Sequence, residues 1–260
     1  MALSGKTGLI LGVANKRSIA WGVAKAWANA GASIHLVCQS ERFLPNVKRL
    51  VADASIDCTV DVCDVTDDAQ LRALGHSIQD RSIGIDAVLH SVAFAPSAAM
   101  RGRFLDTSRS DFAEAHDVSA YSLIALARTV EPFLRPDSSI TTVSYMGSTR
   151  VVPGYNAMGC AKASLEAAAR GLAHELGPSK VRVNVLSPGP IKTVASRGIK
   201  GFSALSTHVE EVSPLGWSPT ENSAQEAVGK AAVFLASDAA SCMSGQVVVL
   251  DGGFSIMMAT

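Results

Sequence analysis

The alternation of short apolar segments with longer amphipathic segments constrains the fold of this chain more than any other feature. Repeated strand–helix units predict a parallel sheet with helices on both faces. We therefore expect an α/β fold built on one doubly wound, Rossmann-like parallel sheet. Strand-like segments cover residues 7–13, 33–38, 56–62, 85–92, 138–144, 181–186 and 246–250, and helix-like segments cover 18–30, 44–52, 67–81, 110–134, 158–172 and 221–235.

The composition agrees with a single globular domain. With 260 residues and 48% hydrophobic content the chain can bury a full core, and no repeat or low-complexity linker divides it, so we predict one domain over residues 1–260. Lysine and arginine number 23, as do aspartate and glutamate, which gives a formal net charge of zero. This balance argues against nucleic acid or a membrane surface as a partner.

Targeting and cysteine patterns indicate a cytoplasmic protein. The apolar run near the N-terminus is too short for a signal peptide, and no apolar run reaches membrane-spanning length. The five cysteines are odd in number and form no C-x-x-C pair, so we predict neither a disulfide framework nor a metal site. A reducing cytoplasm suits these features best.

The turn after the first expected strand has features of a phosphate-binding turn. Gly12 permits a tight turn, Ser18 can cap the following helix and donate its hydroxyl, and Ala20 and Gly22 can let helix and strand pack closely. The spacing differs from G-x-G-x-x-G, and a glycine after a strand is usually only a turn residue. Taken alone, this turn is weak evidence for a dinucleotide.

Two further strand ends favour a dinucleotide cofactor. Gln39 ends the second expected strand, where the adenosine ribose would be read, and Asp64 with Val65 follows the third, where an acid can accept a hydrogen bond from the adenine amine. Each position is explained equally well, taken singly, as an ordinary loop residue. Together they fall at successive strand carboxyl ends, which is where open α/β sheets bind ligands.

Tyr155 and Lys162 lie seven residues apart around the start of an amphipathic helix that follows Pro153 and Gly154. If both are helical they share one face about 10 Å apart, which suits two groups that grip one extended ligand. A nearby ammonium favours the ionised form of a phenol, so the pair can donate a proton to a carbonyl oxygen or stabilise negative charge on it. The alternative is a buried tyrosine with some hydroxyl partner and a solvated lysine.

The chain resembles the short-chain dehydrogenase/reductase superfamily over essentially its whole length. Ordinary members have Tyr-x3-Lys with a serine about thirteen residues upstream, but here the tyrosine position holds Met158 and the serine position holds Tyr145. That departure is typical of a narrower branch, the enoyl-acyl-carrier-protein reductases of bacterial fatty-acid synthesis. The motifs that carry the resemblance are G-x5-S-x-A-x-G from Gly12, H-S-V-A-F-A-P from His90, Tyr145, Tyr155-x6-Lys162, S-P-G-P-I-K-T from Ser187, and the final V-L-D-G-G-F-S.

The resemblance implies a role for each matching residue. Tyr145, Tyr155 and Lys162 would be catalytic, and Ala95 would face the substrate together with the two tyrosines. Ala93 stands where the family commonly has glycine, and its methyl group beside the nicotinamide would narrow access for inhibitors. The cofactor-binding positions would be Gly12, Ser18 and Ile19 at the pyrophosphate, Gln39 at the adenosine ribose, Asp64 and Val65 at the adenine, Ser91 and Val92 at the nicotinamide half, Lys162 at the nicotinamide ribose, and Ile191, Lys192, Thr193, Val194 and Ala195 at the nicotinamide amide.

The activity that the resemblance implies is reduction of the trans-2 double bond of an enoyl thioester on acyl carrier protein in fatty-acid elongation, by a homotetramer. Tyr155 would stabilise the negative charge that hydride transfer leaves on the thioester oxygen. Two alternatives stay open. A carbonyl reductase or alcohol dehydrogenase of the same fold needs the tyrosine that Met158 replaces, and a catalytically silent nucleotide-binding protein would have lost Tyr155 or Lys162.

The cofactor itself can be predicted from the loop after the second expected strand. Gln39 offers a ribose hydroxyl a neutral partner, and Glu41 would repel a 2′-phosphate, so we expect NADH rather than NADPH, with Arg42 as the opposing residue. Further along, the segment 192–208 follows a cofactor-contacting turn and carries two glycines around a small apolar patch. We expect it to be a mobile loop that closes over the substrate.

Overall fold

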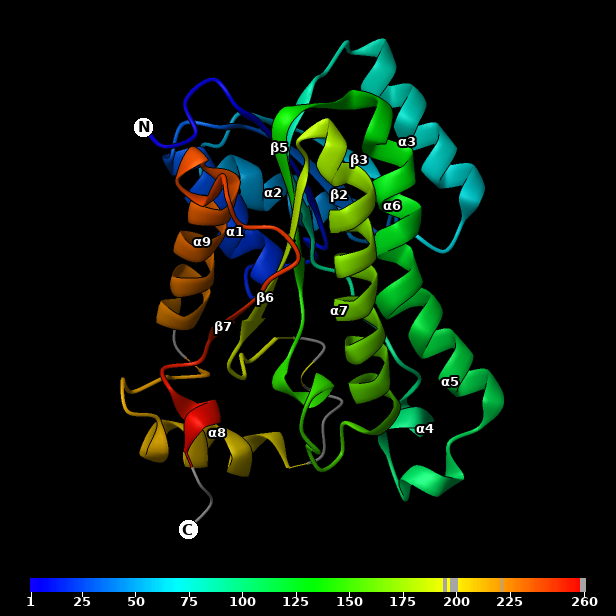
Figure 1. Ribbon diagram of the computed structural model, residues 1–260, viewed down its shortest axis with the longest axis vertical. Coiled ribbons are helices and arrows are strands. Elements are labelled where there is room, and N and C mark those ends of the chain that lie inside the picture. Colours follow the sequence, from blue (N-terminus) through cyan, green and yellow to red (C-terminus); the bar gives the residue numbers. More distant parts are fainter. Residues whose placement is uncertain (194–195, 197–200, 221, 258–260) are drawn as a thin grey trace.

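One parallel sheet of seven strands forms the centre of the molecule, as the sequence predicts (Figure 1). The computed structural model describes residues 1–193, 196, 201–220 and 222–257. The strands pair in the order β3-β2-β1-β4-β5-β6-β7, and each pairing is parallel. They are β1 (Thr7–Leu11), β2 (Ser33–Cys38), β3 (Cys58–Val62), β4 (Ile85–His90), β5 (Leu134–Val143), β6 (Arg182–Pro188) and β7 (Val247–Leu250).

Helices cover both faces of the sheet. On one face pack α1 (Ile19–Asn29), α2 (Leu44–Asp53) and α9 (Asn222–Ala236), and on the other α3 (Asp68–Asp80), α6 (Ser122–Val130) and α7 (Asn156–Leu176). The remaining helices are α4 (Ser97–Met100), α5 (Arg109–His116) and α8 (Phe202–Val212). Within the described part of the chain, none of the helices combines the length and the apolar character that crossing a bilayer requires.

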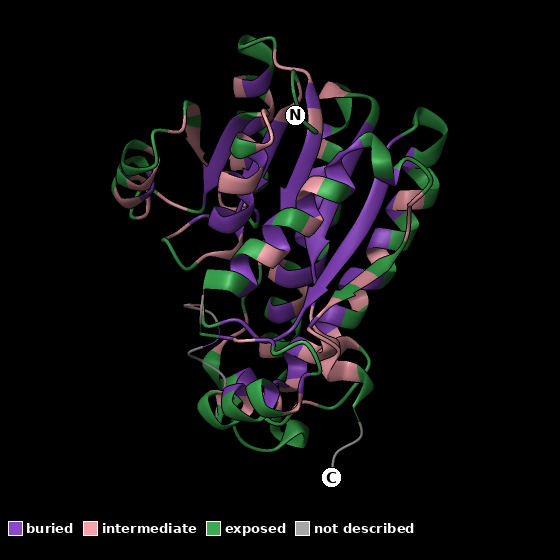
Figure 2. Cartoon of the chain, turned by 90° about the vertical axis from the view of Figure 1, so that its left-hand side faces the viewer, coloured by how far each residue is buried: buried purple, intermediate pink, exposed green. Residues whose placement is uncertain are grey.

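The side chains of β1 show how the sheet separates two cores. Ile10 packs with the core under α1 and α9, whereas Leu9 and Leu11 pack with the core under α3, α6 and α7. Figure 2 shows the central strands buried over most of their length and the exposed residues on the outer sides of the helices. A sheet covered on both faces has no polar side, which explains why its strands appear in the sequence as nearly continuous apolar runs.

The glycine of α1, Gly22, serves a different contact from the one predicted. Gly22 faces α9 and not a strand, since a Cβ there would lie 3.0 Å from the carbonyl oxygen of Gln225. Close approach of helix and strand depends instead on Gly8 of β1, where a Cβ would lie 2.5 Å from the ring of Trp27. Trp27 is fully buried, so its ring fills the space between α1 and the sheet.

The segment 110–134, predicted as one long helix, is interrupted. After α5, a π turn covers Asp117–Tyr121 and α6 follows, and a 3₁₀ turn over Glu131–Phe133 contains Pro132. The π turn brings Ser119 to the backbone of Phe94, where its Oγ accepts a hydrogen bond from the amide nitrogen at 2.9 Å and donates one to the carbonyl oxygen at 2.8 Å. Such turns shift the facing of the residues that follow them. β5 then begins at Leu134, earlier than the expected residue 138.

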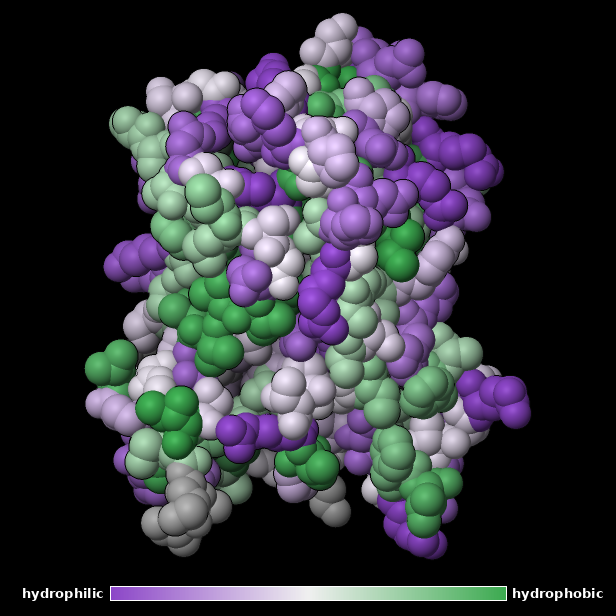
Figure 3. Space-filling view, viewed as in Figure 1, coloured by the Kyte–Doolittle hydropathy of each residue, from purple (hydrophilic) through white to green (hydrophobic). Residues whose placement is uncertain are grey.

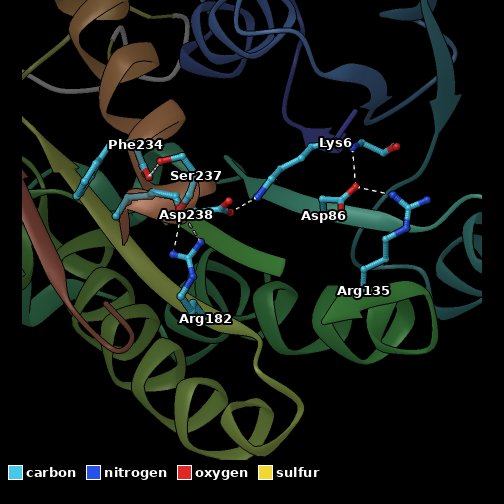
Figure 4. Close-up of polar contacts among 9 residues, drawn as sticks. Lys6, Asp86, Arg135, Arg182, Phe234, Ser237 and Asp238 are labelled. Atoms are coloured by element: carbon cyan, nitrogen blue, oxygen red, sulfur yellow. Dashed lines mark hydrogen bonds and ion pairs between the residues drawn. The ribbon is translucent and has the colours of Figure 1, made fainter. Parts of the chain in front are cut away.

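Polar contacts join the amino-terminal ends of the strands (Figure 4). Lys6 pairs with Asp238 at 2.6 Å, and Arg135 pairs with Asp86 at 2.8 Å. Arg182 donates hydrogen bonds to carbonyl oxygens at the end of α9. Exposed ion pairs contribute about 1 kcal/mol or less each. They lie at the end of the sheet opposite the predicted site, which leaves the carboxyl ends of the strands for ligands.

Candidate active site

The predicted site residues gather at the carboxyl ends of successive strands, with α8 beneath them (Figure 1). This edge is where open parallel sheets bind ligands. The residues that follow each strand are Gly12 after β1, Gln39 after β2, Asp64 after β3, Ser91 after β4, Tyr145 after β5 and Ile191 after β6.

Gly12 ends β1 in a conformation that favours glycine. Its φ is +104°, and a Cβ would overlap the carbonyl oxygen of Ser91. The Ser91 amide in turn donates to the carbonyl oxygen of Leu11 at 3.3 Å. Gly12 therefore lets the ends of β1 and β4 meet, which brings the turns predicted to hold the pyrophosphate and the nicotinamide side by side.

Contrary to the prediction, the side chain of Ser18 makes no capping hydrogen bond to α1. Its Oγ accepts hydrogen bonds from the amides of Ala14 at 3.1 Å and Asn15 at 3.2 Å, so it orders the preceding turn instead. The amides of Ile19 and Ala20, the first two of α1, have no acceptor among the described residues. Free amides at a helix N-terminus suit a phosphate group.

Gln39 and Asp64 are brought together. Gln39 Nε2 donates to Asp64 Oδ2 at 3.2 Å, and the other carboxylate oxygen of Asp64 accepts from the amide and the hydroxyl of Thr66. Partial burial acts to raise the pKa of Asp64, but the hydrogen bonds from Thr66 and Gln39 outweigh it and lower the pKa. Asp64 is therefore an ionised acceptor. Val65 beside it is buried in the core.

The turn after β4 is fixed from two sides. Val92 packs on the core under α3 and α6, and Phe94 is held by Ser119 as described above. Ala93 between them is exposed, so its methyl group points away from the core. Sequence analysis did not identify Ser119, because nothing in its neighbourhood shows that a π turn places it beside residue 94.

Tyr145 and Tyr155 lie in edge contact. Tyr155 is the residue before α7, and its ring centroid is 5.1 Å from that of Tyr145, with the planes at 67°. Tyr155 is 8% exposed and packs with Met100 and Met158, and Ala95 lies at the edge of the same cluster. Burial raises the pKa of Tyr145 to about 12, and burial with the neighbouring Tyr145 raises the pKa of Tyr155 further. Both phenols are therefore neutral hydrogen-bond donors.

The hydroxyl of Tyr145 is buried and has no hydrogen-bond partner among the described residues. A buried polar group without a partner costs about 1–3 kcal/mol, so such groups usually mark a place where a ligand or water binds. This orphaned hydroxyl fits the prediction that Tyr145 faces the substrate.

Two glycines bring α7 against the turn that carries Tyr145. A Cβ at Gly147 would lie 2.5 Å from the Tyr155 ring, and a Cβ at Gly159 would lie 2.8 Å from the carbonyl oxygen of Gly147. The 3₁₀ turn Met146–Ser148 and the first turn of α7 are thus in backbone contact. The spacing of the two tyrosines depends on the absence of side chains at both positions.

Lys162 is buried, so the alternative of a solvated lysine is wrong. It is 4% exposed, and its Nζ donates to the carbonyl oxygen of Val143 at 2.7 Å. Burial lowers its pKa to about 8, against the opposing charge of Glu166. His90 is fully buried between Thr142 and Ser122, and burial, with the Lys162 charge, lowers its pKa to about 3, so it is neutral.

Hydrogen bonds to residues that follow α8 in the chain hold the turn after β6. Trp217 Nε1 donates to the carbonyl oxygen of Pro190 at 2.9 Å, and the amide of Lys192 donates to the carbonyl oxygen of Pro219 at 2.8 Å. Ile191 is buried, and the Thr193 amide donates to Ser196 Oγ. Val194 and Ala195, the other two residues predicted here, lie outside the described residues.

This set of groups fits a dinucleotide with a nicotinamide end. It offers free amides at α1, an amide–carboxylate pair at the ends of β2 and β3, and a buried ammonium and phenols at the end of β5. No group of three or more His, Cys, Asp or Glu in the described ranges could hold a metal ion. The arrangement can bind a reduced nicotinamide and donate a hydrogen bond to a substrate oxygen beside it.

The sheet order and this site define a reductase of the short-chain dehydrogenase/reductase class. The family described as Enoyl-(Acyl carrier protein) reductase matches residues 12–255. The chain belongs to the enoyl-acyl-carrier-protein reductase family.

Full-length relatives and solved structures agree with this assignment. The enoyl-acyl-carrier-protein reductase (NADH) FabI of Synechocystis sp. is 42% identical over 258 residues, 98% of each chain, and FabI of Escherichia coli is 41% identical over 255 residues, 98% of this chain and 95% of that one. The crystal structure of the reductase (NADH) from Aquifex aeolicus has a TM-score of 0.93 at 39% identity, covering 100% of both chains. That of the Bacillus cereus reductase with NADP+ and indole naphthyridinone has a TM-score of 0.95 at 41% identity, covering 99% of both.

Proposed function

We propose that this protein is an NADH-dependent reductase of the trans-2 double bond of enoyl thioesters carried by acyl carrier protein, acting in fatty-acid elongation. The observation that carries the proposal is the group at the end of β5, where Tyr145 and Tyr155 are in edge contact and the buried Lys162 of α7 is bonded to Val143, two residues before Tyr145. Membership of the enoyl-acyl-carrier-protein reductase family supports the substrate class, and the names of the relatives support NADH.

The residues at this site have distinct tasks. NADH, when bound, supplies the hydride that reaches the β-carbon of the substrate. Tyr155 is neutral and buried, so it donates a hydrogen bond to the thioester oxygen on which negative charge develops, and such a preorganised donor commonly contributes about 3–4 kcal/mol. Lys162 holds the nicotinamide ribose and keeps the local potential positive, and Tyr145 shapes the cleft and offers its free hydroxyl.

The position of Met158 argues against a carbonyl reductase. Met158 is 5% exposed and packs in the apolar cluster of Met100 and Tyr155, so no phenol occupies the place it fills. The test is the absorbance of NADH mixed with a crotonyl thioester and, separately, with an acetoacetyl thioester. We expect oxidation with the crotonyl compound alone. Oxidation with the acetoacetyl compound alone would indicate a carbonyl reductase, and none with either would indicate a silent nucleotide-binding protein.

A basic loop beside Tyr155 supports acyl carrier protein as the partner. Arg101 and Arg103 are exposed and have no ion-pair partner among the described residues. Their loop is joined to the start of α7 by the packing of Met100 on Tyr155 and by a 3.5 Å hydrogen bond from Asn156 Nδ2 to Gly102. The arm that links an acyl group to its carrier contains a phosphodiester, which suits guanidinium groups.

An exposed sheet edge supports association of copies of this chain, which we propose form a homotetramer. β7 ends the sheet, and Val247 and Val249 on it are 36% and 54% exposed. Figure 3 shows hydrophobic side chains gathered over β7. An open, apolar strand edge is a common pairing surface. The oligomeric mass measured by light scattering tests this part of the proposal.

The segment 192–208 is proposed as the part that closes over the substrate. From Phe202 onward it is not a loop but α8, and residues 194–195 and 197–200 lie outside the described residues. α8 lies below the carboxyl ends of the strands, and its N-cap residue Gly201 has φ +80°, a conformation suited to a hinge.

A further inference from the structure

Two side chains one turn apart on α7 reach consecutive residues at the end of β5. Lys162 Nζ donates to the carbonyl oxygen of Val143 at 2.7 Å, and Ser144 Oγ donates to Glu166 Oε1 at 2.6 Å. The next residue is Tyr145. Lys162, Ser144 and Glu166 are 4%, 3% and 7% exposed, so water hardly competes with either bond. Helix and strand are therefore joined immediately before the residue predicted to face the substrate.

We propose that Glu166 is a positioning residue of the reductase site, which holds Ser144 and thereby Tyr145 against α7 and keeps Lys162 in place as a charged ammonium. The proposal rests on the proposed function, since it assigns Glu166 to the support of that site. In this role Glu166 itself contacts neither the substrate nor the cofactor. It acts through Ser144 and through the charge of Lys162.

The effect of Glu166 on the charge of Lys162 follows from the titratable groups around Lys162. Burial lowers the pKa of Lys162 to about 8, and Glu166 is the group that raises it against burial. The other titratable neighbours carry no charge near pH 7, since His90 of β4 has its pKa lowered to about 3, and Tyr145 and Tyr155 have theirs raised. An opposite charge within a few ångströms typically shifts a pKa by about 1–3 units. Removal of Glu166 should therefore lower the pKa of Lys162 further.

Glu166 also lines a cavity. A cavity of about 340 Å³ is lined by Glu166, by Ser187 at the end of β6, by Val247 and Val249 of β7, and by Asp251. No ion pair of Glu166 occurs among the described residues, and its side-chain hydrogen-bond partner is the hydroxyl of Ser144. Arg150 and Asp251 line the same cavity, so they are the other charged side chains around it.

The two parts can be separated by substitution. Glu166→Gln keeps an acceptor for Ser144 but removes the charge, whereas Ser144→Ala removes the hydrogen bond but keeps the charge. Glu175→Gln, at an exposed position on the same helix, is the matched control. Glu166→Asp restores the charge with a shorter side chain.

The first measurement is the NADH dissociation constant by isothermal titration from about pH 6 to about pH 10. In the wild type and in Glu175→Gln, affinity should fall as Lys162 deprotonates above about pH 8. In Glu166→Gln the midpoint should move down by about one pH unit or more, and Glu166→Asp should bring it back toward the wild type. A midpoint equal to that of the wild type in Glu166→Gln would overturn the charge part.

The second measurement is kcat and KM for Ser144→Ala on a crotonyl thioester. Loss of the bond that holds Tyr145 should lower kcat about tenfold or more at unchanged NADH affinity. An unchanged kcat would overturn the positioning part, and this variant decides the matter if Glu166→Gln does not fold. NADH titration needs no turnover, so a wild type that binds NADH but reduces no enoyl thioester would count against the proposed function and not against the role of Glu166.

Discussion

The rings of Tyr145 and Tyr155 meet edge to face, but their hydroxyls differ in what surrounds them. The Tyr145 hydroxyl is buried without a partner among the described residues, and Tyr155 is the more deeply buried phenol, at the start of α7. Substitution of either tyrosine by phenylalanine keeps the ring and removes the hydroxyl. The contribution of the ring contact can therefore be measured separately from that of each hydroxyl.

Tyr155→Phe should lower kcat about 10²–10³-fold with little change in NADH affinity, because it removes a donor to the developing oxyanion and leaves the ring in place. Tyr145→Phe is the matched control, since it removes the other hydroxyl of the same ring pair. We expect a smaller loss of kcat there. Steady-state kinetics and isothermal titration check both, and a larger loss in Tyr145→Phe would exchange the roles of the two residues.

Burial of Lys162 should appear in the pH dependence of stability. Its pKa is lowered from 10.5 to about 8 by burial, so between these values the unfolded chain binds more protons at this residue than the folded one. The free energy of unfolding should therefore rise with pH in this window relative to Lys162→Met, by at most about 3 kcal/mol. Urea unfolding of both proteins near pH 8 and near pH 10 measures this, and parallel changes would contradict it.

NADH should be preferred over NADPH. Gln39 is bonded to Asp64, which places an amide and a carboxylate where a 2′-phosphate would bring further negative charge, and Glu41 beside them is exposed. Arg42 is exposed and has no ion pair among the described residues. The ratio of kcat/KM for the two cofactors at one ionic strength, in the wild type and in Arg42→Ala, decides the matter. A ratio that favours NADPH and collapses in Arg42→Ala would mean that Arg42 binds the phosphate.

Arg101→Glu with Arg103→Glu should raise KM about tenfold for a substrate on acyl carrier protein, because the pair faces solvent beside Tyr155 and reversing its charge repels an anionic carrier arm. Lys230→Glu on the exposed side of α9 changes the net charge by half as much and is the control for a charge reversal away from this loop. The same substrate on coenzyme A shows whether the loop recognises the phosphodiester or the carrier protein. An unchanged KM on both would remove this loop from the docking surface.

Ligands should protect the segment 192–208 from trypsin. Arg197 and Lys200 are the cleavage sites of interest, and both lie outside the described residues. We expect NADH with a saturated thioester to slow cleavage there, while cleavage at the exposed Lys180 serves as an internal reference. Equal rates with and without ligands would count against a closing segment.

Much of the sheet could be predicted from the sequence because parallel strands covered on both faces are continuous apolar runs. β2 was expected at its observed bounds, whereas β1 stops at Leu11, two residues early, because Gly12 turns with positive φ. The break between α5 and α6 and the helical start of α8 could not be predicted, since the first depends on Ser119 meeting Phe94 and the second on packing below the sheet.

The residues of the site likewise separate into those that can be predicted from the sequence and those that only the fold reveals. Tyr155 and Lys162 could be proposed from their helical spacing, and Tyr145 from the resemblance to the enoyl-acyl-carrier-protein reductases. Glu166 and Ser144 could not, because their bond joins α7 to β5 across 22 positions of the chain and no local pattern reports it. The solvated or buried state of Lys162 likewise depends on what packs around it, which only the fold determines.

The contact between Gly147 and the Tyr155 ring limits which amino-acid substitutions the protein can tolerate. A methyl group there would lie 2.5 Å from the ring, so even alanine would push the phenol away from the place where the substrate oxygen must be met. Gly147 carries no functional group, yet its substitution should resemble the loss of a catalytic residue in activity assays. Substitutions that change access to the site are therefore expected at exposed positions such as Ala93 rather than at Gly147.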